Sequence, residues 1–368
     1  MAGRVRGFHL RTSSPTGSEC VGSLPEGRSD RARNSFDLLR LIAAGAVLWS
    51  HQHALLKLPE PLFPGLAATF GGFGVYIFFA ISGYLNAGSL LRGQSSPRFL
   101  LNRVLRIYPA LAACVVFMVC LGAATTSLAM LDFLLDGSVS AFVLRNMTLL
   151  FGISPTLPGV FEASAFPRAM NGSLWTLPYE VDLYILLAVV LAVCRFRTYA
   201  IYVLFAVAAI YVAFFAVEAD PRRVLPGVLV GHLTLFAMLF LAGALMAACE
   251  RDRFFELGPV LCIAVAGMAL ILQSSTLGRL LAFAAIVILL GRLTLPSWLT
   301  PKIDLSYGIY LYAFPVQQIV ATVTTDFWTA LAASAAVTVG LAYISNKLIE
   351  APALQLKASL RKAEYARA

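Results

Sequence analysis

Apolar runs of bilayer-spanning length recur along the chain from about residue 38 to near its end. A helix needs about 20 mainly apolar residues to cross the hydrocarbon core of a bilayer, and the runs are close to that length. They predict spans at roughly 38–56, 68–90, 104–125, 177–194, 198–217, 228–249, 257–273, 277–292, 305–324 and 326–346. The pattern therefore predicts an all-α fold, a polytopic membrane helix bundle of about ten transmembrane helices.

The pair of ranges within 257–292 has two readings. Only the polar stretch 273–276 separates the two short runs, and Arg279 sits just inside the second. Two short spans and a re-entrant hairpin both fit this pattern.

The polar flanks divide the chain into three predicted parts. Residues 1–36 are rich in Arg, Ser and Gly and lack the apolar core of a cleavable signal peptide, so we expect a disordered basic cytoplasmic tail. Residues 37–350 form the predicted transmembrane domain, and residues 351–368 a cytoplasmic C-terminal tail.

One connection, at about 126–176, is far longer than the others. Its apolar piece at 139–153 is too short and too charged to span, so we expect it to lie in the membrane interface or to dip into the bundle. A long loop on a bundle of short connections is where a lid or an acceptor site is expected.

Composition agrees with the pattern. Of 368 residues, 59% are hydrophobic and 13% are charged, against about 45–50% and 25% in soluble domains. These values exclude an ordinary soluble enzyme and a disordered chain. The six Cys have no CxxC pair and lie mostly inside apolar runs, so we expect neither a disulfide framework nor a metal site.

The placement of the net charge of +9 predicts the orientation. If the N-terminus is inside, the inner segments hold 22 of the 28 Lys and Arg residues and the outer segments hold six. By the positive-inside rule we expect a multi-pass protein of the cytoplasmic (inner) membrane, with both termini cytoplasmic and an even number of spans. We expect the protein to contact membrane lipids and not to bind nucleic acid.

Ionisable residues inside spans are costly, so each is a functional hypothesis. Arg40 and His51 lie on one predicted helix, about 16 Å apart along its axis. Arg40 would sit at the cytoplasmic mouth and His51 in the outer half, where an imidazole can act as a general base on a hydroxyl. The alternative is a structural His that hydrogen-bonds to a neighbouring helix.

Two further segments offer polar groups near the predicted inner side. The run 71–84 is rich in Gly and aromatic residues and includes Ser82. It fits close helix packing, or a cavity wall that includes the Ser82 hydroxyl. Arg103 and Arg106 share a helix face at the start of a span. They fit either topology charges that snorkel to lipid phosphates, or a site for a phosphorylated cytosolic ligand.

The entry to the fourth span carries a carboxylate. Only twelve uncharged apolar residues run from Leu183 to Cys194, so the helix must draw Glu180 into its outer turn. There it needs a cationic or hydrogen-bonding partner, for which His51 is a candidate. Trp175 and Tyr179 fit an interfacial aromatic belt as well as a ligand contact.

Taken together, and in their order along the chain, these segments resemble the acyltransferase 3 family of integral membrane acyltransferases over residues 36 to about 355. The matching elements are the Arg40 to His51 spacing with Ser50, the run 78–84, Arg103 and Arg106 before Pro109, the segment 171–180, the segment 305–312, and Ile349-Glu350-Ala351-Pro352. Two positions depart from the family pattern: Ala313 stands where many members carry a His, and Ala351 where Arg is commoner.

The resemblance implies transfer of an acyl group, usually acetyl from acetyl-CoA, to a hydroxyl of a surface carbohydrate or lipid-linked glycan. The acyl-CoA is then a donor substrate, and no permanently bound cofactor is expected. Arg40, Arg103 and Arg106 would hold its phosphates, and His51 would act as general base with Glu180 orienting it. Transient acylation of His51 is the alternative.

Five residues of the matching segments are expected to contact the substrate: Ser82, Ser173, Trp175, Tyr179 and Tyr310. A transporter or flippase of a glycan precursor is the competing function, in which the buried His and carboxylate would relay protons. Transporters built from internal repeats have two similar halves, and the sequence has no visible symmetry of that kind.

Overall fold

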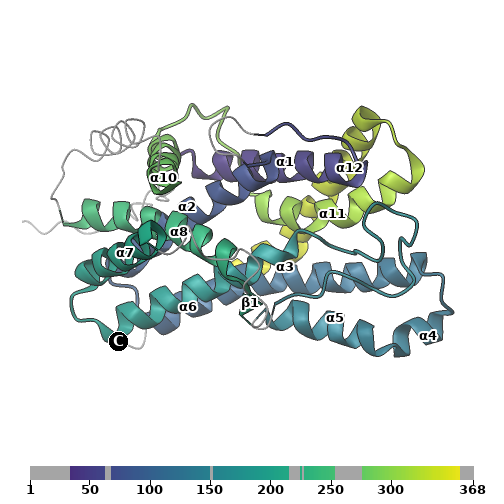
Figure 1. Ribbon diagram of the computed structural model, residues 1–368, viewed down its shortest axis with the longest axis horizontal. Helices are drawn as coiled ribbons and strands as arrows, with labels where there is room; N and C mark the ends of the chain where they lie inside the picture. The colour runs from purple at the N-terminus through teal and green to yellow at the C-terminus, as the bar shows by residue number, and fades with distance from the viewer. Residues whose placement is uncertain are drawn as a thin grey trace, which may run out of the picture. The chain divides into compact units, whose positions relative to one another are not determined.

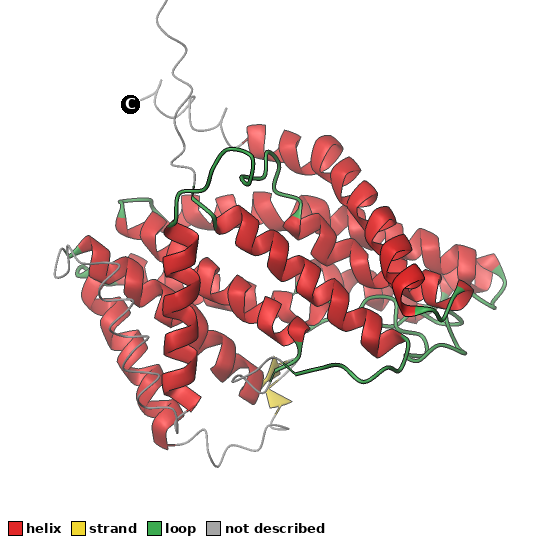
Figure 2. Cartoon of the chain, turned by 90° about the horizontal axis from the view of Figure 1, so that it is seen from above, coloured by secondary structure: helices red, strands yellow, loops and turns green. Residues whose placement is uncertain are grey.

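The computed structural model of the chain describes residues 34–62, 68–149, 152–214, 224–225, 228–252 and 276–356. This part is almost entirely helical (Figure 1). Its elements are α1 (Phe36–Leu55), α2 (Phe70–Leu91), α3 (Ser96–Thr125), α4 (Met130–Leu135), α5 (Gly137–Thr148), the 3-10 turn η1 (Leu174–Thr176), α6 (Leu177–Val193), α7 (Arg197–Phe214), β1 (Val224–Leu225), β2 (Val228–Leu229), α8 (Val230–Arg251), α10 (Thr276–Arg292), α11 (Ser306–Val323), α12 (Phe327–Ser345) and the π-helical turn η2 (Asn346–Glu350). Within the described ranges, the antiparallel β1–β2 hairpin is the exception to the helical pattern (Figure 2).

The helices follow the predicted apolar runs. Nine of the ten predicted ranges contain a helix, and the tenth, 257–273, lies outside the described residues, as does the choice between two spans and a hairpin there. Among the described helices, five segments are long and apolar enough to cross a membrane: Phe70–Leu91, Ser96–Thr125, Leu174–Val193, Gly231–Arg251 and Phe327–Leu356. The chain is thus a helical membrane protein, and the count of about ten spans stays a prediction.

Some helices begin or end at other residues than predicted, because charged residues flank their apolar runs. Helix α3 begins at Ser96, well before the predicted residue 104, because Arg98 and Arg103 continue a helix that an apolar window does not detect. Helical backbone also continues from Glu350 to residue 356. The remainder of the two predicted tails, 1–33 and 357–368, lies outside the described residues.

Helix α2 organises the bundle because it packs against both α1 and α8. A Cβ atom at Gly83 would collide with the backbone of Phe240, and one at Gly243 would collide with the carbonyl of Ala80. Small residues on both helices therefore allow the two backbones to touch, as they commonly do in membrane bundles. Helix α11 packs in turn against α1 and α12.

The long connection between α3 and α6 turns back on the bundle. Helices α4 and α5 pack against α3, and the Tyr108 hydroxyl donates a hydrogen bond to the Thr148 carbonyl (3.3 Å). Tyr108 lies in the first half of α3, so α5 reaches back along that helix instead of staying at its end (Figure 1). The structure thus packs this piece against α3, and whether it lies in the membrane interface or dips into the bundle stays a prediction.

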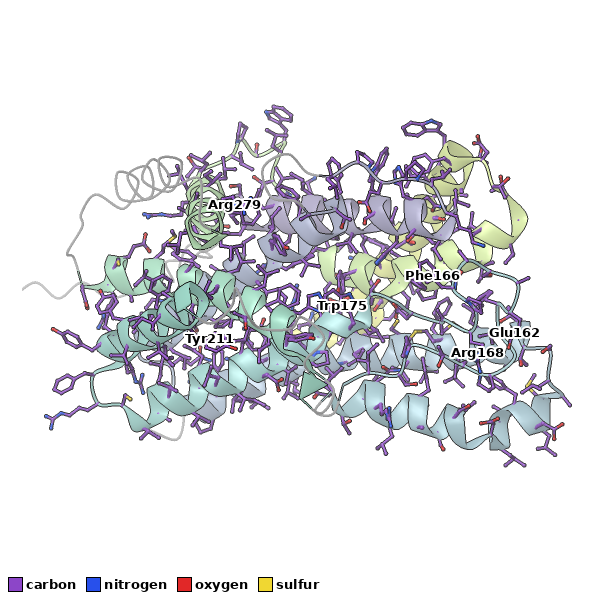
Figure 3. The ribbon with its side chains drawn as sticks, viewed as in Figure 1. Glu162, Phe166, Arg168, Trp175, Tyr211 and Arg279 are labelled. Atoms are coloured by element: carbon purple, nitrogen blue, oxygen red, sulfur yellow. The ribbon has the colours of Figure 1, made fainter. Side chains whose placement is uncertain are left out.

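The last part of the connection is tied to helix α11. The Gln318 side-chain amide donates to the carbonyls of Phe166 and Ala169 (3.1 and 2.8 Å). Figure 3 shows Glu162, Phe166 and Arg168 together on this loop, with Trp175 nearer the middle of the bundle. The loop is therefore anchored as it leads into η1 and α6.

Candidate active site

The three predicted arginines line one cavity of about 800 Å³, which we call the arginine cavity. Arg40 comes from α1, and Arg103 and Arg106 come from α3. The rest of its lining is Val75, Phe78, Phe79, Ser82, Asn86, Ile107, Thr176, Leu177, Glu180, Tyr184, Ser306, Tyr307 and Tyr310. The cavity thus brings together guanidinium groups from α1 and α3, contributed by residues more than sixty positions apart in the sequence.

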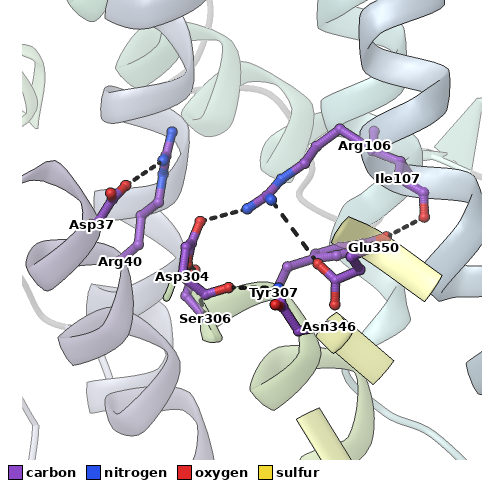
Figure 4. A network of polar contacts seen from close by, with 9 residues as sticks. All are labelled: Asp37, Arg40, Arg106, Ile107, Asp304, Ser306, Tyr307, Asn346 and Glu350. Carbon is purple, nitrogen blue, oxygen red and sulfur yellow. Dashed lines mark hydrogen bonds and ion pairs between the residues drawn. The ribbon is translucent and has the colours of Figure 1, made fainter. Parts of the chain in front are cut away.

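Arg106 is held in an ion-pair network (Figure 4). Its guanidinium lies 2.5 Å from the Asp304 carboxylate and 4.0 Å from Glu350, which is buried. Asn346 donates to the Asp304 carbonyl (3.3 Å), and Tyr307 donates to the Ile107 carbonyl (3.0 Å). The network ties α3 to the loop before α11 and to η2.

Asp304 is ionised in this network at neutral pH. Burial by itself would raise the pKa of its carboxyl, but the attraction of Arg106 and Arg40 and the hydrogen bonds from Ser306 outweigh burial and hold the pKa below its usual value. Its charge therefore compensates that of Arg106.

The other two arginines are less fully neutralised. Arg40 pairs with Asp37, one turn away on α1 (3.2 Å). The Arg103 guanidinium lies over the rings of Phe99 and Tyr184, 5.6 and 5.8 Å from their centroids, and has no carboxylate partner within the described ranges. Arg103 thus keeps the most available positive charge of the three for an anionic ligand.

A second cavity, of about 730 Å³, adjoins the first; we call it the histidine cavity. Its lining is Val47, Ser50, His51, Ala68, Thr69, Gly71, Gly72, Val75, Tyr76, Ser173, Trp175, His232, Leu235, Phe236 and Tyr310. Val75 and Tyr310 line both cavities. These two side chains therefore mark the boundary between the cationic and the imidazole-containing space.

Three polar atoms at the histidine cavity lack protein partners. His51 Nδ1, His232 Nδ1 and Ser173 Oγ are buried and make no hydrogen bond to the part of the chain that the structure describes. The His51 ring is held edge to face by Phe314, with 5.2 Å between ring centroids. Buried polar atoms are nearly always satisfied, and exceptions often mark sites that bind ligands or react.

The predicted pairing of Glu180 with His51 is wrong. The Glu180 carboxylate lines the arginine cavity, where it accepts hydrogen bonds from Ser82 (3.1 Å) and from Tyr184. The reason is that α6 begins inside the bundle: Asn171 donates to the Leu311 carbonyl (2.9 Å), so the segment before the helix is itself buried. The first turn of α6 therefore faces the arginines and not His51.

The predicted substrate residues divide between the two cavities. Ser82 lines the arginine cavity, Ser173 and Trp175 line the histidine cavity, and Tyr310 lines both. The Tyr310 hydroxyl donates to the Ser173 carbonyl (2.6 Å) and is 2.5 Å from the Thr176 hydroxyl, so it also fixes η1.

Tyr179 lines neither cavity. Its side chain is buried and packs edge to face against Trp175 and Phe236, with centroid distances of 6.0 and 5.4 Å. Its position supports the wall of the histidine cavity from behind. The structure therefore does not bear out the predicted direct contact with substrate.

Comparison with known proteins shows the family of the chain. A sequence model of the acyltransferase 3 family, described as an acyltransferase domain, matches residues 33–347. The chain belongs to the acyltransferase 3 family. It is 30% identical over 327 residues to a protein of Shigella phage Sf6 named O-acetyl transferase, covering 86% of this chain and 95% of that protein.

A second relative is Nodulation protein 10 of Rhizobium leguminosarum bv. viciae, 31% identical over 362 residues, which covers 89% of this chain and 95% of that protein. No solved structure matches the chain. The chain is thus an enzyme, a membrane acyltransferase similar over most of its length to an O-acetyl transferase. Family membership favours acyl transfer over the transporter alternative.

Three polar residues of the acyltransferase escaped the sequence analysis. His232 lies in the first turn of α8, and the rule that flagged His51, an ionisable group within an apolar run, applies equally to it. Asp304 and Glu60 lie in connections, where charge is ordinary. No sequence signal marks them, because their partners Arg106 and Ser50 are identified only by the tertiary fold.

Proposed function

We propose that this acyltransferase moves an acyl group, acetyl in the simplest case, from cytosolic acyl-CoA to a hydroxyl of a cell-surface carbohydrate or lipid-linked glycan. The observation that carries the proposal is the adjacency of the two cavities, one lined by three arginines and the next by His51, with Val75 and Tyr310 common to both. The name of the phage relative supports an O-linked acetyl product.

The donor fits the arginine cavity by charge. Coenzyme A carries several phosphate charges, and arginine binds phosphate through charge-assisted hydrogen bonds. Arg103 is the main phosphate ligand in this proposal because it has no competing carboxylate within the described ranges, whereas Arg106 is paired with Asp304. Arg40 and Arg106 add positive potential.

The reaction takes place in the histidine cavity, beyond Val75 and Tyr310. His51 accepts the proton of the acceptor hydroxyl as its oxygen attacks the thioester carbonyl carbon; a C–O bond forms, the C–S bond breaks, and the thiolate takes the proton. Transient acylation of His51, followed by transfer to the acceptor, is the mechanistic alternative. Glu180 then holds Ser82 and Tyr184 in place on the donor side.

The acceptor contacts the wall formed by η1 and the preceding loop. Trp175 offers an aromatic face and Ser173 an unpartnered hydroxyl, groups that suit the faces and hydroxyls of a sugar. The arrangement requires the arginine end at the cytosol and the histidine cavity toward the cell exterior. The excess of positive charge on the segments assigned to the inside supports this orientation in the inner membrane.

The first test uses the strain that carries the gene. Deletion is expected to remove O-acetyl groups from a surface glycan, read by mass spectrometry, and the wild-type gene to restore them. His51→Ala is expected to fail to restore them although the protein is present in the membrane. Continued export of an unacetylated glycan supports the proposal, whereas loss of export with unchanged acetylation would refute it.

The same helix offers a matched control. His53 lies two residues after His51, but its ring packs against Trp49 and Phe327 and lines neither cavity. His53→Gln is therefore expected to retain acetylation. Equal loss in the His51 and His53 variants would assign the effect to folding instead of chemistry.

A further inference from the structure

The histidine cavity contains a second imidazole, which comes from a different helix. His51 comes from α1 and His232 from α8, and both line the same space together with Ser173. The Nδ1 atoms of both rings are buried without a partner in the described part of the chain. The mechanism above uses only His51, so His232 needs a separate explanation.

Aromatic packing holds the His232 ring in place without occupying its nitrogens. It stacks on Phe236, with 6.0 Å between centroids and an interplanar angle of 15°, and meets Trp175 edge to face at 4.8 Å. Contacts of this kind fix ring orientation. The ring is therefore oriented for a ligand in the cavity, as an imidazole nitrogen that serves a substrate must be.

The two imidazoles differ in what lies behind them. Ser50, next to His51 in sequence and on the same cavity wall, donates to the Glu60 carboxylate (2.8 Å). The His232 ring packs against Trp175 and Phe236, apolar surroundings in which a neutral imidazole is favoured over a charged one.

We propose that His232 is a second catalytic residue. Its neutral ring donates an N–H hydrogen bond to the carbonyl oxygen of the acyl thioester, while His51 accepts the proton of the acceptor hydroxyl and passes it to the thiolate. The inference rests on the proposed function and extends it with a named oxyanion donor. A preorganised donor of this type stabilises the charge that develops on oxygen in the transition state.

The step balances without any further reactant. The acceptor O–H bond breaks and its proton goes to His51; the acceptor oxygen bonds to the acyl carbon, and negative charge moves to the carbonyl oxygen, where His232 donates. The carbonyl re-forms, the C–S bond breaks, and the thiolate takes the proton from His51. His232 keeps its own proton throughout.

The two proposed roles predict opposite effects on activity when each histidine is replaced by glutamine. A Gln amide can donate a hydrogen bond in place of an imidazole N–H, but it cannot accept and return a proton at neutral pH. His232→Gln should therefore rescue much of the activity that His232→Ala loses, whereas His51→Gln should be as inactive as His51→Ala. A purely structural role for His232 does not predict this contrast.

The experiment uses inverted membrane vesicles of the deletion strain that contain the full-length protein, radiolabelled acetyl-CoA as the probe, and the endogenous membrane glycans as acceptor. Label in the glycan fraction is measured for both His pairs and for His53→Gln, a control whose ring packs against Trp49 and Phe327 and lines neither cavity. Protein amount is matched by immunoblot.

We expect His232→Ala to lower kcat by about 10²–10³-fold, the usual effect of losing one oxyanion donor, with the acetyl-CoA KM unchanged because the arginine cavity is intact. Activity of His232→Gln at least tenfold above that of His232→Ala, with His53→Gln near wild type, supports the proposal. The proposal is overturned if His232→Ala is as active as His53→Gln, or if Gln restores activity at position 51 and not at position 232. No label transfer by the wild type would overturn the proposed function as well.

Discussion

The ion pair between Arg106 and Asp304 makes a quantitative test of how the arginine cavity is built. The change is Asp304→Asn, which keeps the shape of the side chain and removes its charge. Among the residues that the structure describes, Arg106 then retains only the Glu350 carboxylate, 4.0 Å away, as an ion-pair partner. The variant leaves a guanidinium under-compensated where α3, the loop before α11 and η2 meet.

The structure sets the size of the effect. Two unit charges 4 Å apart attract by about 4 kcal/mol at an effective dielectric constant of 20, and breaking a buried pair on one side costs about 3–5 kcal/mol. The Arg106 and Asp304 side chains are 26% and 17% exposed, so solvent screens part of the attraction. We expect the free energy of unfolding to fall by about 2–4 kcal/mol.

The assay is denaturant unfolding of the purified protein in a mild detergent. Asp326→Asn is the matched control: Asp326 caps α12 by accepting from the Thr329 amide (2.8 Å), and Asn caps a helix equally well. The double variant Asp304→Asn with Arg106→Gln should lose less than the sum of the single variants. If Asp304→Asn loses no more stability than the control, this account of the ion pair is refuted.

The same residue predicts an acid dependence. Because the pKa of Asp304 is lower in the folded protein than its usual value, its contribution to stability is present above the unfolded pKa of about 3.9 and is lost as pH falls through the folded pKa. Wild type should therefore lose more stability than Asp304→Asn between about pH 5 and the folded-state pKa. Equal pH slopes in unfolding experiments would contradict this reasoning.

Three further outcomes test the bundle and its cavities. Gly83→Ala should sharply reduce the folded yield in detergent, because a Cβ there meets the Phe240 backbone, whereas Gly45→Ala, with open space around it, should be neutral or slightly stabilising; similar yields would contradict the close packing of α2 and α8. Arg103→Gln should raise the acetyl-CoA KM by about tenfold or more through loss of a charge-assisted phosphate contact, with stability unchanged; an unchanged KM would remove Arg103 from the donor site. Asn171→Ala should cost about 1–3 kcal/mol in unfolding free energy through its lost bond to the Leu311 carbonyl, and a loss under 0.5 kcal/mol would indicate that η1 is held by other contacts.

Much of the helical framework follows from sequence because the membrane imposes it. Apolar runs long enough to span must be helical, since backbone groups in hydrocarbon have no other partners. The nine described helices at predicted positions reflect that constraint, and the ends that moved, as at Ser96, are those where a charged turn continues the helix. The same reasoning placed Arg40, Arg103 and His51 among the functional candidates, because each is an ionisable group in or beside an apolar run.

The neighbours of these residues could not be derived in the same way. Glu180 was paired with His51 on the assumption that α6 begins at the outer rim, and the buried anchor at Asn171 moves its first turn to the arginines. Tyr179 is expected from sequence to contact substrate or to lie in an interfacial aromatic belt, yet it is buried behind Trp175. Both errors concern depth, which depends on how the loop before the helix packs.

By itself, the sequence determined the membrane-helical class, the family, and the few polar residues that the apolar runs must accommodate. Tertiary structure alone decided which of them share a cavity. Three arginines line one space, Asp304 neutralises one of them, and His51 shares its cavity with His232 and not with Glu180. The physical reason is that hydropathy is a property of each segment, whereas a polar group's partner is set by helix rotation and depth. Those depend on contacts between segments far apart in the chain.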